Sequence, residues 1–321
     1  MEIITKTSAT TKAYLQRGKL LWNKAAQEQG VDPNNQLPSD YLSWLEKRLP
    51  ILKPATRRLY ISATKEFLIH SYNNDGQQNL KAAIQKSMQM QSNQYTPLVK
   101  VSFQPSNTSN QKAKRIDFNE LALLVKNTQD MKGKWIKPAL LWMLANIQVG
   151  LRPSEWKSAS LIEAGGKTTL VVVNGKNTNG RAHGLLRHLE VTNLKYEELK
   201  WVKLQLEAIR LYVKDDATWE IYYGGVRKTI HKITRKFLTN RNKYISLYST
   251  RHQFSANAKS EGMSKIEVAA LMGHAVDETA GLHYGKKKHG SGNCKVKACK
   301  AEMQKVRIKS IPQIIQSPRM S

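Results

Sequence analysis

Cysteine and long apolar runs are scarce in this sequence of 321 residues. With only Cys294 and Cys299, it has neither a disulfide framework nor enough thiols for a four-cysteine zinc site. No apolar run reaches the roughly 18 residues that a membrane-spanning helix needs. The first thirty residues lack the basic start, apolar centre and cleavage site of a signal peptide. We therefore expect a cytoplasmic protein with free thiols and no membrane partner.

Acidic residues are also few, because 24 Asp and Glu face 52 Lys and Arg, which gives a formal net charge of +28. An excess of this size repels itself within a compact protein and predicts an anionic partner, most commonly nucleic acid. Hydrophobic residues make up 40% of the chain, which is typical of globular proteins rather than disordered or fibrous ones. The length predicts about two domains.

Residues 1–90 are expected to form the first of these domains. Apolar residues recur there at spacings of three and four, with Lys and Arg between them, which predicts a small helical domain with a basic face. The alternative is an ordinary helical bundle whose basic surface is only solvated. Residues 91–115 are rich in Gln, Ser, Asn, Thr and Pro and predict a linker.

Residues 116–285 are expected to form a second, larger domain. Asp117 is a predicted helix cap, and residues 135–148 predict an apolar helix. The run Thr-Thr-Leu-Val-Val-Val-Asn at 168–174 is the clearest strand, with residues 186–192 as its hairpin partner. The fold class is therefore mainly α with a small β-sheet (α+β).

The remainder of the second domain is predicted to be helical up to residue 284, with breaks near Asp215, Gly224 and Gly262. Residues 286–321 carry many Lys and Arg but the single acid Glu302. We interpret this segment as a basic carboxy-terminal tail. It either docks on a neighbouring copy, through an apolar edge formed by Ile308, Ile311, Ile314 and Ile315, or grips the anionic partner.

Three local motifs stand out in the second domain. Residues 149–156 read Val-Gly-Leu-Arg-Pro-Ser-Glu-Trp, residues 250–254 read Thr-Arg-His-Gln-Phe, and Leu-Met-Gly-His at 271–274 precedes His-Tyr at 283–284. In order and spacing these segments resemble the signature motifs of the tyrosine recombinase (phage integrase) family. The resemblance covers residues 117–284 in detail and the helical amino-terminal domain only in outline. It implies a helical DNA-clamping domain followed by a catalytic domain.

The chemistry of phosphodiester cleavage accounts for these residue types. Arg152 and Arg251 can each donate two hydrogen bonds to the nonbridging oxygens of a phosphate. These hydrogen bonds become stronger as negative charge develops on the oxygens in the transition state. A tyrosine hydroxyl becomes a nucleophile when a neighbour takes its proton or cations favour the phenolate. The resemblance assigns this role to Tyr284, which would form a 3′-phosphotyrosine link.

The resemblance also implies the other catalytic residues. Lys176 lies in the hairpin loop from which the family's lysine protonates the departing 5′-oxygen, although Lys167 and Arg181 are nearby alternatives. His274 would hydrogen-bond the phosphate or help to manage the tyrosine proton. His252 is expected to be structural. The scheme needs no cofactor, no ATP and no metal, and the sequence offers no carboxylate pair to hold a metal.

Two positions depart from the family pattern. Tyr248 stands where the family usually has His or Lys, three residues before the second arginine, and a tyrosine is a poor base at neutral pH. We include Tyr248 as an uncertain catalytic candidate. The interval from His274 to Tyr284 is one residue longer than is common in the family.

The resemblance implies a site-specific recombinase that acts on double-stranded DNA as a homotetramer, with accessory proteins that set its direction. One alternative is a topoisomerase IB-like enzyme, which nicks and religates DNA without exchanging partners. Another is a DNA-binding protein that keeps the fold and is impaired in catalysis. The departure at Tyr248 favours the second alternative, whereas the joint presence of the other candidate residues opposes it.

Overall fold

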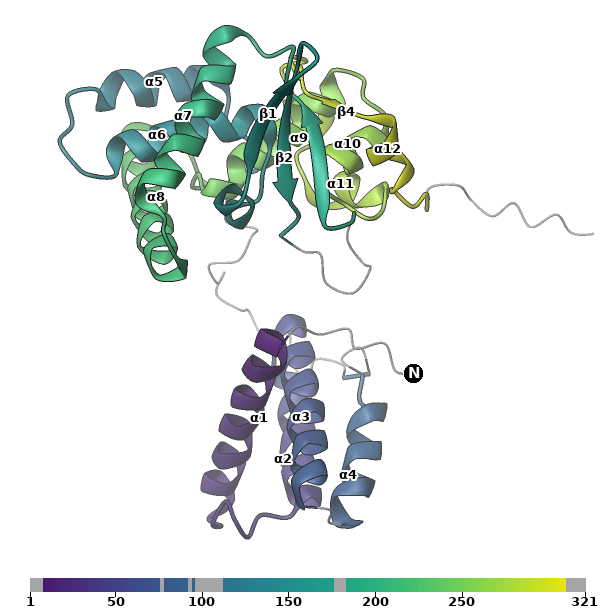
Figure 1. The fold of residues 1–321 in the computed structure, drawn as a ribbon. Helices are drawn as coiled ribbons and strands as arrows, with labels where there is room; N and C mark the ends of the chain where they lie inside the picture. The colour runs from purple at the N-terminus through teal and green to yellow at the C-terminus, as the bar shows by residue number, and fades with distance from the viewer. Residues whose placement is uncertain (1–7, 76–77, 92–93, 96–111, 176–182, 310–321) are drawn as a thin grey trace, which may run out of the picture. The chain divides into compact units, whose positions relative to one another are not determined.

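The fold is described from a computed structural model, which describes residues 8–75, 78–91, 94–95, 112–175 and 183–309 (Figure 1). The chain divides into two compact units, residues 1–106 and residues 107–321. No helix within the described ranges is long and apolar enough to cross a membrane.

The first unit is helical, as the apolar spacing predicts. It contains α1 (Ser8–Gln29), α2 (Pro38–Arg48), α3 (Pro54–Asp75) and α4 (Gln78–Gln89), with the 3-10 turn η1 (Leu49–Ile51) after α2. Tyr41, Leu42 and Leu45 of α2 are buried in its core, and the Tyr41 hydroxyl is 2.7 Å from Thr64 Oγ1 on α3. This buried pair joins α2 to α3 and satisfies both hydroxyl groups.

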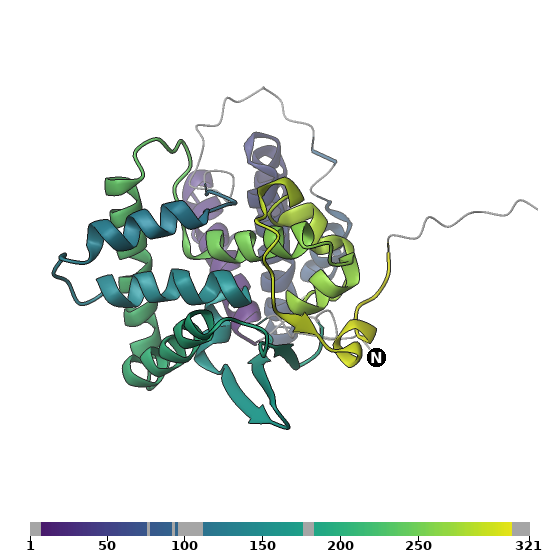
Figure 2. The same cartoon turned by 90° about the horizontal axis from the view of Figure 1, so that it is seen from above.

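The second unit combines helices with one small sheet. Its first helices are α5 (Phe118–Thr128) and α6 (Ile136–Val149), which lie side by side in Figure 2. The predicted cap at Asp117 is present, because its side chain accepts from the Glu120 amide and Glu120 returns a bond to the Asp117 amide. The predicted apolar helix is α6, and a 3-10 turn, η3 (Pro153–Lys157), follows it.

The sheet has four antiparallel strands in the order β1 (Ser160–Ala164), β2 (Lys167–Val173), β3 (Leu186–Glu190) and β4 (Lys297–Ala298). The predicted hairpin is confirmed as β2 and β3, with Val171 opposite His188. Leu170 and Val172 of β2 and Leu189 of β3 are buried, as alternation along a half-buried strand requires.

The remaining helices are α7 (Tyr196–Tyr212), α8 (Asp216–Phe237), α9 (Leu247–Ser260), α10 (Lys265–Leu271), α11 (Glu278–His283) and α12 (Lys300–Gln304). In Figure 1, α5 to α8 lie on one side of the strands and α10 to α12 on the other. The break predicted at Asp215 is present as a helix cap, but the one at Gly224 is wrong. The helix runs through both glycines, and the missing Cβ of Gly225 lets it pack against the Trp135 ring, where a Cβ atom would lie 2.5 Å from ring atoms.

The carboxy-terminal segment differs from the predicted tail. Within residues 286–309, η4 (Lys287–His289) packs on α9, β4 pairs with β3, and α12 packs on α10. Val296 and Val306 are buried, so apolar side chains hold this basic segment on the second unit. Residues 310–321, which include the predicted docking isoleucines Ile311, Ile314 and Ile315, lie outside the described residues.

Candidate active site

Two glycine turns position the backbone around the arginines. Gly150 caps α6 with φ of 63°, and Gly273 follows α10 with φ of 60°. A Cβ atom on Gly150 would lie 2.2 Å from the Phe254 ring, so only glycine fits this left-handed turn. The Gly150 carbonyl accepts a hydrogen bond from Arg251, and the Gly273 carbonyl accepts one from Arg152 at 3.2 Å.

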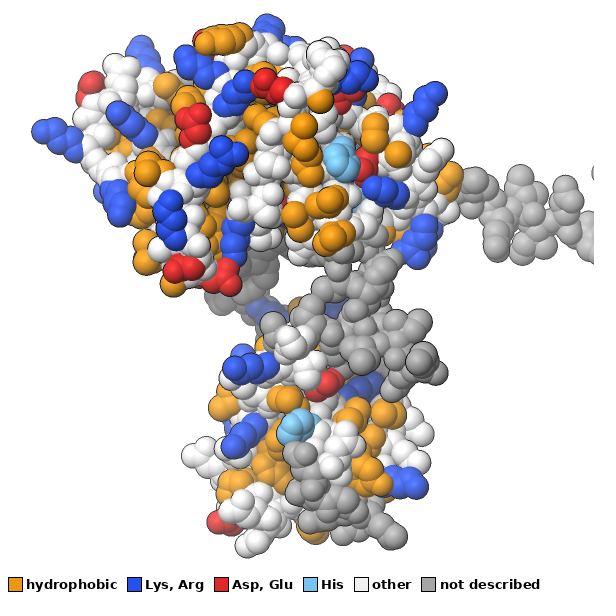
Figure 3. Space-filling model, in the orientation of Figure 1, with side chains coloured by type: hydrophobic (Ala, Val, Ile, Leu, Met, Phe, Trp, Pro, Cys, Tyr) orange, Lys and Arg blue, Asp and Glu red, His pale blue; other side chains and the backbone are white. Residues whose placement is uncertain are grey.

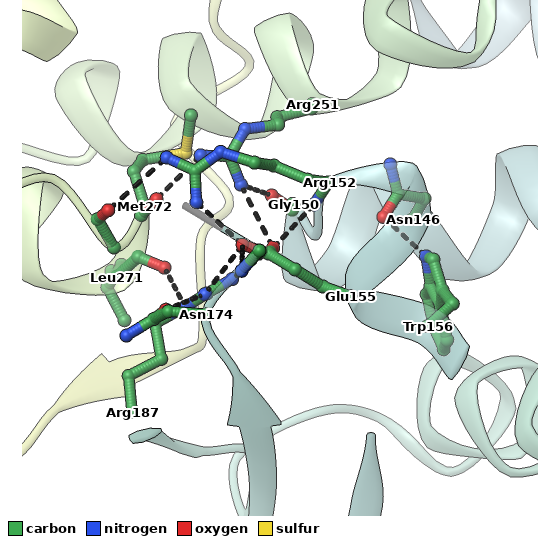
Figure 4. A network of polar contacts seen from close by, with 12 residues as sticks. Asn146, Gly150, Arg152, Glu155, Trp156, Asn174, Arg187, Arg251, Leu271 and Met272 are labelled. Carbon is green, nitrogen blue, oxygen red and sulfur yellow. Dashed lines mark hydrogen bonds and ion pairs between the residues drawn. The ribbon is translucent and has the colours of Figure 1, made fainter. Parts of the chain in front are cut away.

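One buried carboxylate, that of Glu155, joins three arginines (Figure 4). Arg152 Nη1 donates to Glu155 Oε1 at 2.6 Å, and Arg187 donates to both carboxylate oxygens at 3.1 and 2.7 Å. Arg251 Nη1 lies 3.7 Å from Glu155 Oε2. Burial by itself raises the pKa of Glu155, but Arg187, Arg251 and Arg152 together hold it well below its usual range.

This cluster holds more positive than negative charge. The three guanidinium groups carry three positive charges against the single negative charge of Glu155. Arg251 is completely buried, and burial together with Arg152 lowers its pKa to about 10, so it stays protonated at neutral pH. Excess charge out of water is costly unless an anion compensates it, so the arrangement suits an anionic ligand.

Tyr284 lies directly after α11 and faces Arg251. Arg251 Nε donates to the Tyr284 hydroxyl oxygen at 3.4 Å, and the guanidinium carbon lies 5.3 Å from the centroid of the tyrosine ring. Lys259 Nζ donates to the carbonyls of Ala280 and Gly285, each at 2.7 Å, and so holds the chain on both sides of Tyr284. The predicted nucleophile and the second arginine are therefore brought together.

His274 joins the same group. Its ring centroid is 5.0 Å from that of Tyr284, and its Nε2 is 3.5 Å from Arg251 Nη2. Burial, followed by the charges of Arg251, Arg152 and Arg187, lowers the pKa of His274 to about 2. The imidazole is neutral at physiological pH, so only one of its nitrogens carries a proton to donate.

Tyr248 lies in the first turn of α9 and is 37% exposed. Burial raises the pKa of its hydroxyl, an effect that Arg251 opposes and Tyr284 reinforces. The uncertain candidate is therefore within electrostatic range of both catalytic candidates, but its hydroxyl is held in the protonated form.

Lys176 lies outside the described residues. The residue before it, Gly175, donates its amide to Glu155 Oε1 at 3.3 Å, so the chain leading to Lys176 reaches the arginine cluster. The alternative Lys167 is the first residue of β2, and an extended strand places it roughly 20 Å from Val173 at the other end. Its ammonium group pairs with Glu190 at 3.6 Å. Arg181, the other alternative, is also outside the described residues.

Three residues of this network had no role assigned from the sequence: Glu155, Arg187 and Asn174, whose Oδ1 accepts a hydrogen bond from Arg187. Glu155 lies within the first motif, but its task of joining three arginines depends on chain segments that meet only in the fold. Arg187 occupies an inward position of β3, between exposed Leu186 and exposed His188. A charged residue at an inward strand position is rare without a partner, and that was the available signal.

A second buried carboxylate fastens α12 to the sheet. Glu302 is 2.7 Å from His183 Nε2 and 2.9 Å from His188 Nδ1, and it accepts from Lys305 at 3.0 Å. Burial raises the pKa of Glu302, but these three partners lower it overall. His183 lies just before β3, so this contact holds the chain that leads into β3 against α12.

A basic groove of about 560 Å³ lies between α8 and the segment after it. Among the residues that the structure describes, no acidic side chain lines this groove, which is formed by Lys112, Arg227, Lys228, His231, Arg235, Asn242, Tyr244, Ile245 and Ser246. Figure 3 shows Lys and Arg side chains spread over the visible face of each unit, with acidic side chains interspersed among them. Such surfaces are suited to phosphate groups.

No model of a known protein family matches this chain, and no curated protein matches its sequence. Among solved structures, it is similar to the XerH site-specific recombinase bound to difH substrate in a pre-cleavage complex. The TM-score is 0.51 at 16% identity, and the match covers 84% of this chain and 75% of that chain. The predicted resemblance to tyrosine recombinases, and the mainly α fold class with a small sheet, are therefore confirmed at the level of the fold.

Two further structures give weaker matches. The XerH post-cleavage complex with a palindromic difH substrate has a TM-score of 0.49 at 14% identity, covering 84% of this chain and 74% of that chain. A lambda integrase dimer bound to a COC′ core site has a TM-score of 0.44 at 13% identity, covering 84% of this chain and 75% of that chain.

Proposed function

We propose that this chain is a site-specific DNA recombinase that cleaves and rejoins duplex DNA through a covalent 3′-phosphotyrosine intermediate at Tyr284. The observation that carries the proposal is the position of the Tyr284 hydroxyl, 3.4 Å from Arg251 Nε at the edge of a buried cluster with excess positive charge. A tyrosine nucleophile beside paired guanidinium groups is suited to attack on a phosphodiester.

The proposed reaction uses the residues of this site in one displacement. Arg152 and Arg251 hold the nonbridging oxygens, and His274 donates a further hydrogen bond to the phosphate. The Tyr284 oxygen forms a bond to phosphorus while the bond from phosphorus to the 5′-oxygen breaks, and Lys176 protonates that oxygen. Rejoining reverses the same steps, so the energy of the broken bond is kept without ATP. Arg187 is a positioning residue, because it holds Glu155 against Arg152.

Basic surfaces on the protein support duplex DNA as the substrate. The groove along α8 and the net charge of +28 supply many cations, and the XerH structure with the similar fold contains difH substrate. We propose that the helical first unit and the second unit both contact the duplex, and that four copies assemble on DNA to exchange strands. Accessory proteins would then set the direction of exchange.

The proposal is tested with nicked suicide substrates drawn from DNA that flanks the gene. Purified wild type should form a protein–DNA adduct that survives denaturation, and Tyr284→Phe should form none although it binds the same duplexes. Recovery of exchanged products, rather than only relaxed plasmid, separates a recombinase from a topoisomerase-like enzyme. An adduct that persists in Tyr284→Phe would overturn the assignment of the nucleophile.

A DNA-binding protein impaired in catalysis is the second candidate function. It is favoured by the hydrogen bonds that Arg251 already makes within the protein. Besides Tyr284, the guanidinium donates to the Gly150 carbonyl and, at 2.6 Å, to the Met272 carbonyl. A phosphate must therefore compete with Tyr284 for the remaining donors. Tight, salt-sensitive binding without any adduct from wild type would support this candidate.

A further inference from the structure

The proposed cleavage needs a group that takes the phenolic proton of Tyr284. An ordinary tyrosine has a pKa near 10 and is mostly protonated at neutral pH. Tyr248 is poorly suited to accept this proton, because burial raises the pKa of its own hydroxyl and so keeps that hydroxyl protonated. The other titratable rings in contact with Tyr284 among the described residues are those of His252 and His274.

His252 is in contact with the nucleophile from α9. Its ring centroid is 5.0 Å from that of Tyr284, with an angle of 47° between the ring planes. The backbone directly after Tyr284 packs against the turn of α9 that contains His252, since a Cβ atom on Gly285 would be 2.3 Å from the His252 carbonyl oxygen. His252 and Tyr284 are thus held together by backbone packing as well as by ring contact.

One ring nitrogen of His252 makes no hydrogen bond within the described part of the chain. Its Nδ1 is buried, and it has no hydrogen-bond partner among the described residues. Buried polar atoms are nearly always hydrogen-bonded, and His274 Nδ1, on the other histidine in contact with Tyr284, is likewise buried without a partner among the described residues. Each ring therefore contacts Tyr284 and keeps a nitrogen that is able to take up a proton during the reaction, but His274 Nε2 is 3.5 Å from Arg251 Nη2.

His274 is equally close to Tyr284, but its surroundings oppose protonation more strongly. The charges of Arg251, Arg152 and Arg187 all act on it, and its pKa is lowered to about 2. Burial, with Lys114, Arg251 and Lys259, lowers the pKa of His252 only to about 4. His252 is therefore neutral at physiological pH, and a phosphate bound at Arg251 would add negative charge that raises its pKa.

We propose that His252 is the general base that accepts the phenolic proton of Tyr284 during cleavage and returns it during rejoining. The proton moves to a ring nitrogen of His252, directly or through one water molecule, as the Tyr284 oxygen bonds to phosphorus. The 5′-oxygen leaves with a proton from Lys176, so the imidazolium remains until the reverse step. This inference rests on the proposed function and assigns a proton acceptor within the same site.

The test measures single-turnover adduct formation on a suicide substrate between pH 5 and pH 9. His252→Phe keeps the ring contact and removes the nitrogen, and His252→Gln is a second variant in case the first packs poorly. Each should react about 10²-fold more slowly than wild type at pH 7 while binding DNA equally well. The matched control is His283→Phe, which replaces an exposed histidine directly before Tyr284 and should react like wild type.

The pH profile separates proton transfer from packing. The wild-type rate should level off once His252 is neutral, whereas the rate of His252→Phe should keep rising about tenfold per pH unit, because the phenolate must form without a base. Added imidazole should accelerate His252→Ala. A slower His252→Phe whose profile levels off as in wild type would show a packing role and overturn the inference.

Activity of the wild type separates this inference from the proposed function. If wild type forms the adduct and His252→Phe matches its rate and profile, the inference alone is wrong. If wild type forms no adduct, the proposed function is wrong, and the inference is wrong with it.

Discussion

Arg251 Nε donates to the hydroxyl oxygen of Tyr284 although the two residues are 33 positions apart along the chain. The same guanidinium donates from Nη1 to the Gly150 carbonyl and from Nη2 to the Met272 carbonyl. These two backbone contacts fix the plane of the guanidinium, and its Nε edge faces Tyr284, the proposed nucleophile. One side chain therefore holds two glycine turns together and orients toward the Tyr284 hydroxyl.

Arg251→Lys should abolish most of the adduct formation, because a single ammonium group cannot bond both carbonyls and also face Tyr284. We expect a decrease of at least about 10²-fold in the single-turnover rate, with little change in DNA affinity. The measurement is suicide-substrate cleavage beside a binding titration. A lysine variant of near wild-type rate would mean that charge alone is sufficient at this position.

Glu155→Gln should destabilise the second unit, because it leaves the buried guanidinium groups of Arg187 and Arg251 without their carboxylate. Breaking a buried ion pair from one side costs about 3–5 kcal/mol in the free energy of unfolding, which urea denaturation measures. The control is Glu163→Gln, whose exposed pair with Lys203 at 2.8 Å should contribute less than about 1 kcal/mol. Equal effects of the two substitutions would contradict this interpretation of the cluster.

Glu302→Gln should weaken the contacts between α12 and the chain that leads into β3. Glu302 holds buried His183 and also His188, so we expect a loss of stability and a slower cleavage step with unchanged DNA affinity. Lys305→Ala is the matched control, because it removes a contact to the same carboxylate from a side chain that is 42% exposed. If cleavage slows equally in both variants, the buried histidines are not the cause.

Arg227→Ala combined with Arg235→Ala should weaken DNA binding through the basic groove. If each arginine contacts one phosphate, the slope of log affinity against log salt should fall by about 1.8 for the pair. Fluorescence anisotropy over a salt series measures this slope. Lys203→Ala, on α7 and paired with Glu163, should leave the slope unchanged. An unchanged slope in the double variant would exclude the groove as a phosphate surface.

The stability of the protein should decrease as pH falls below about 6.5. Burial lowers the pKa of His183, His252 and His274 below the value of an unfolded histidine. The unfolded chain then binds more protons than the folded one, so the stabilisation is complete above about pH 6.5 and is lost as pH falls toward the folded pKa values. Each group changes the free energy of unfolding by at most about 1.4 kcal/mol per pH unit.

Urea unfolding at several pH values between 5 and 7.5 measures this dependence. His252→Phe should show a shallower decrease than wild type, because it removes one group whose pKa differs between the two states. A free energy of unfolding that stays constant over this range would mean that these histidines titrate normally in the folded protein.

Local patterns in the sequence were sufficient for much of the second unit. The cap at Asp117, the apolar helix α6 and the hairpin of β2 and β3 depend on neighbours a few residues apart, so spacing and residue type predicted them. The resemblance carried by the three motifs singled out Arg152, Arg251, His274 and Tyr284, which the fold brings together.

Other features were decided only by tertiary packing. The helix runs through Gly224, and its packing through Gly225 against Trp135, far away in the sequence, was not visible in the local pattern. The predicted basic tail folds onto the sheet up to residue 309 because its few apolar side chains find a buried surface. The tasks of Glu155, Arg187 and Glu302 likewise arise from charges on separate segments that must neutralise one another once water is excluded. Sequence therefore determined which residues are candidates for the proposed chemistry, and packing decided which partners hold them in place.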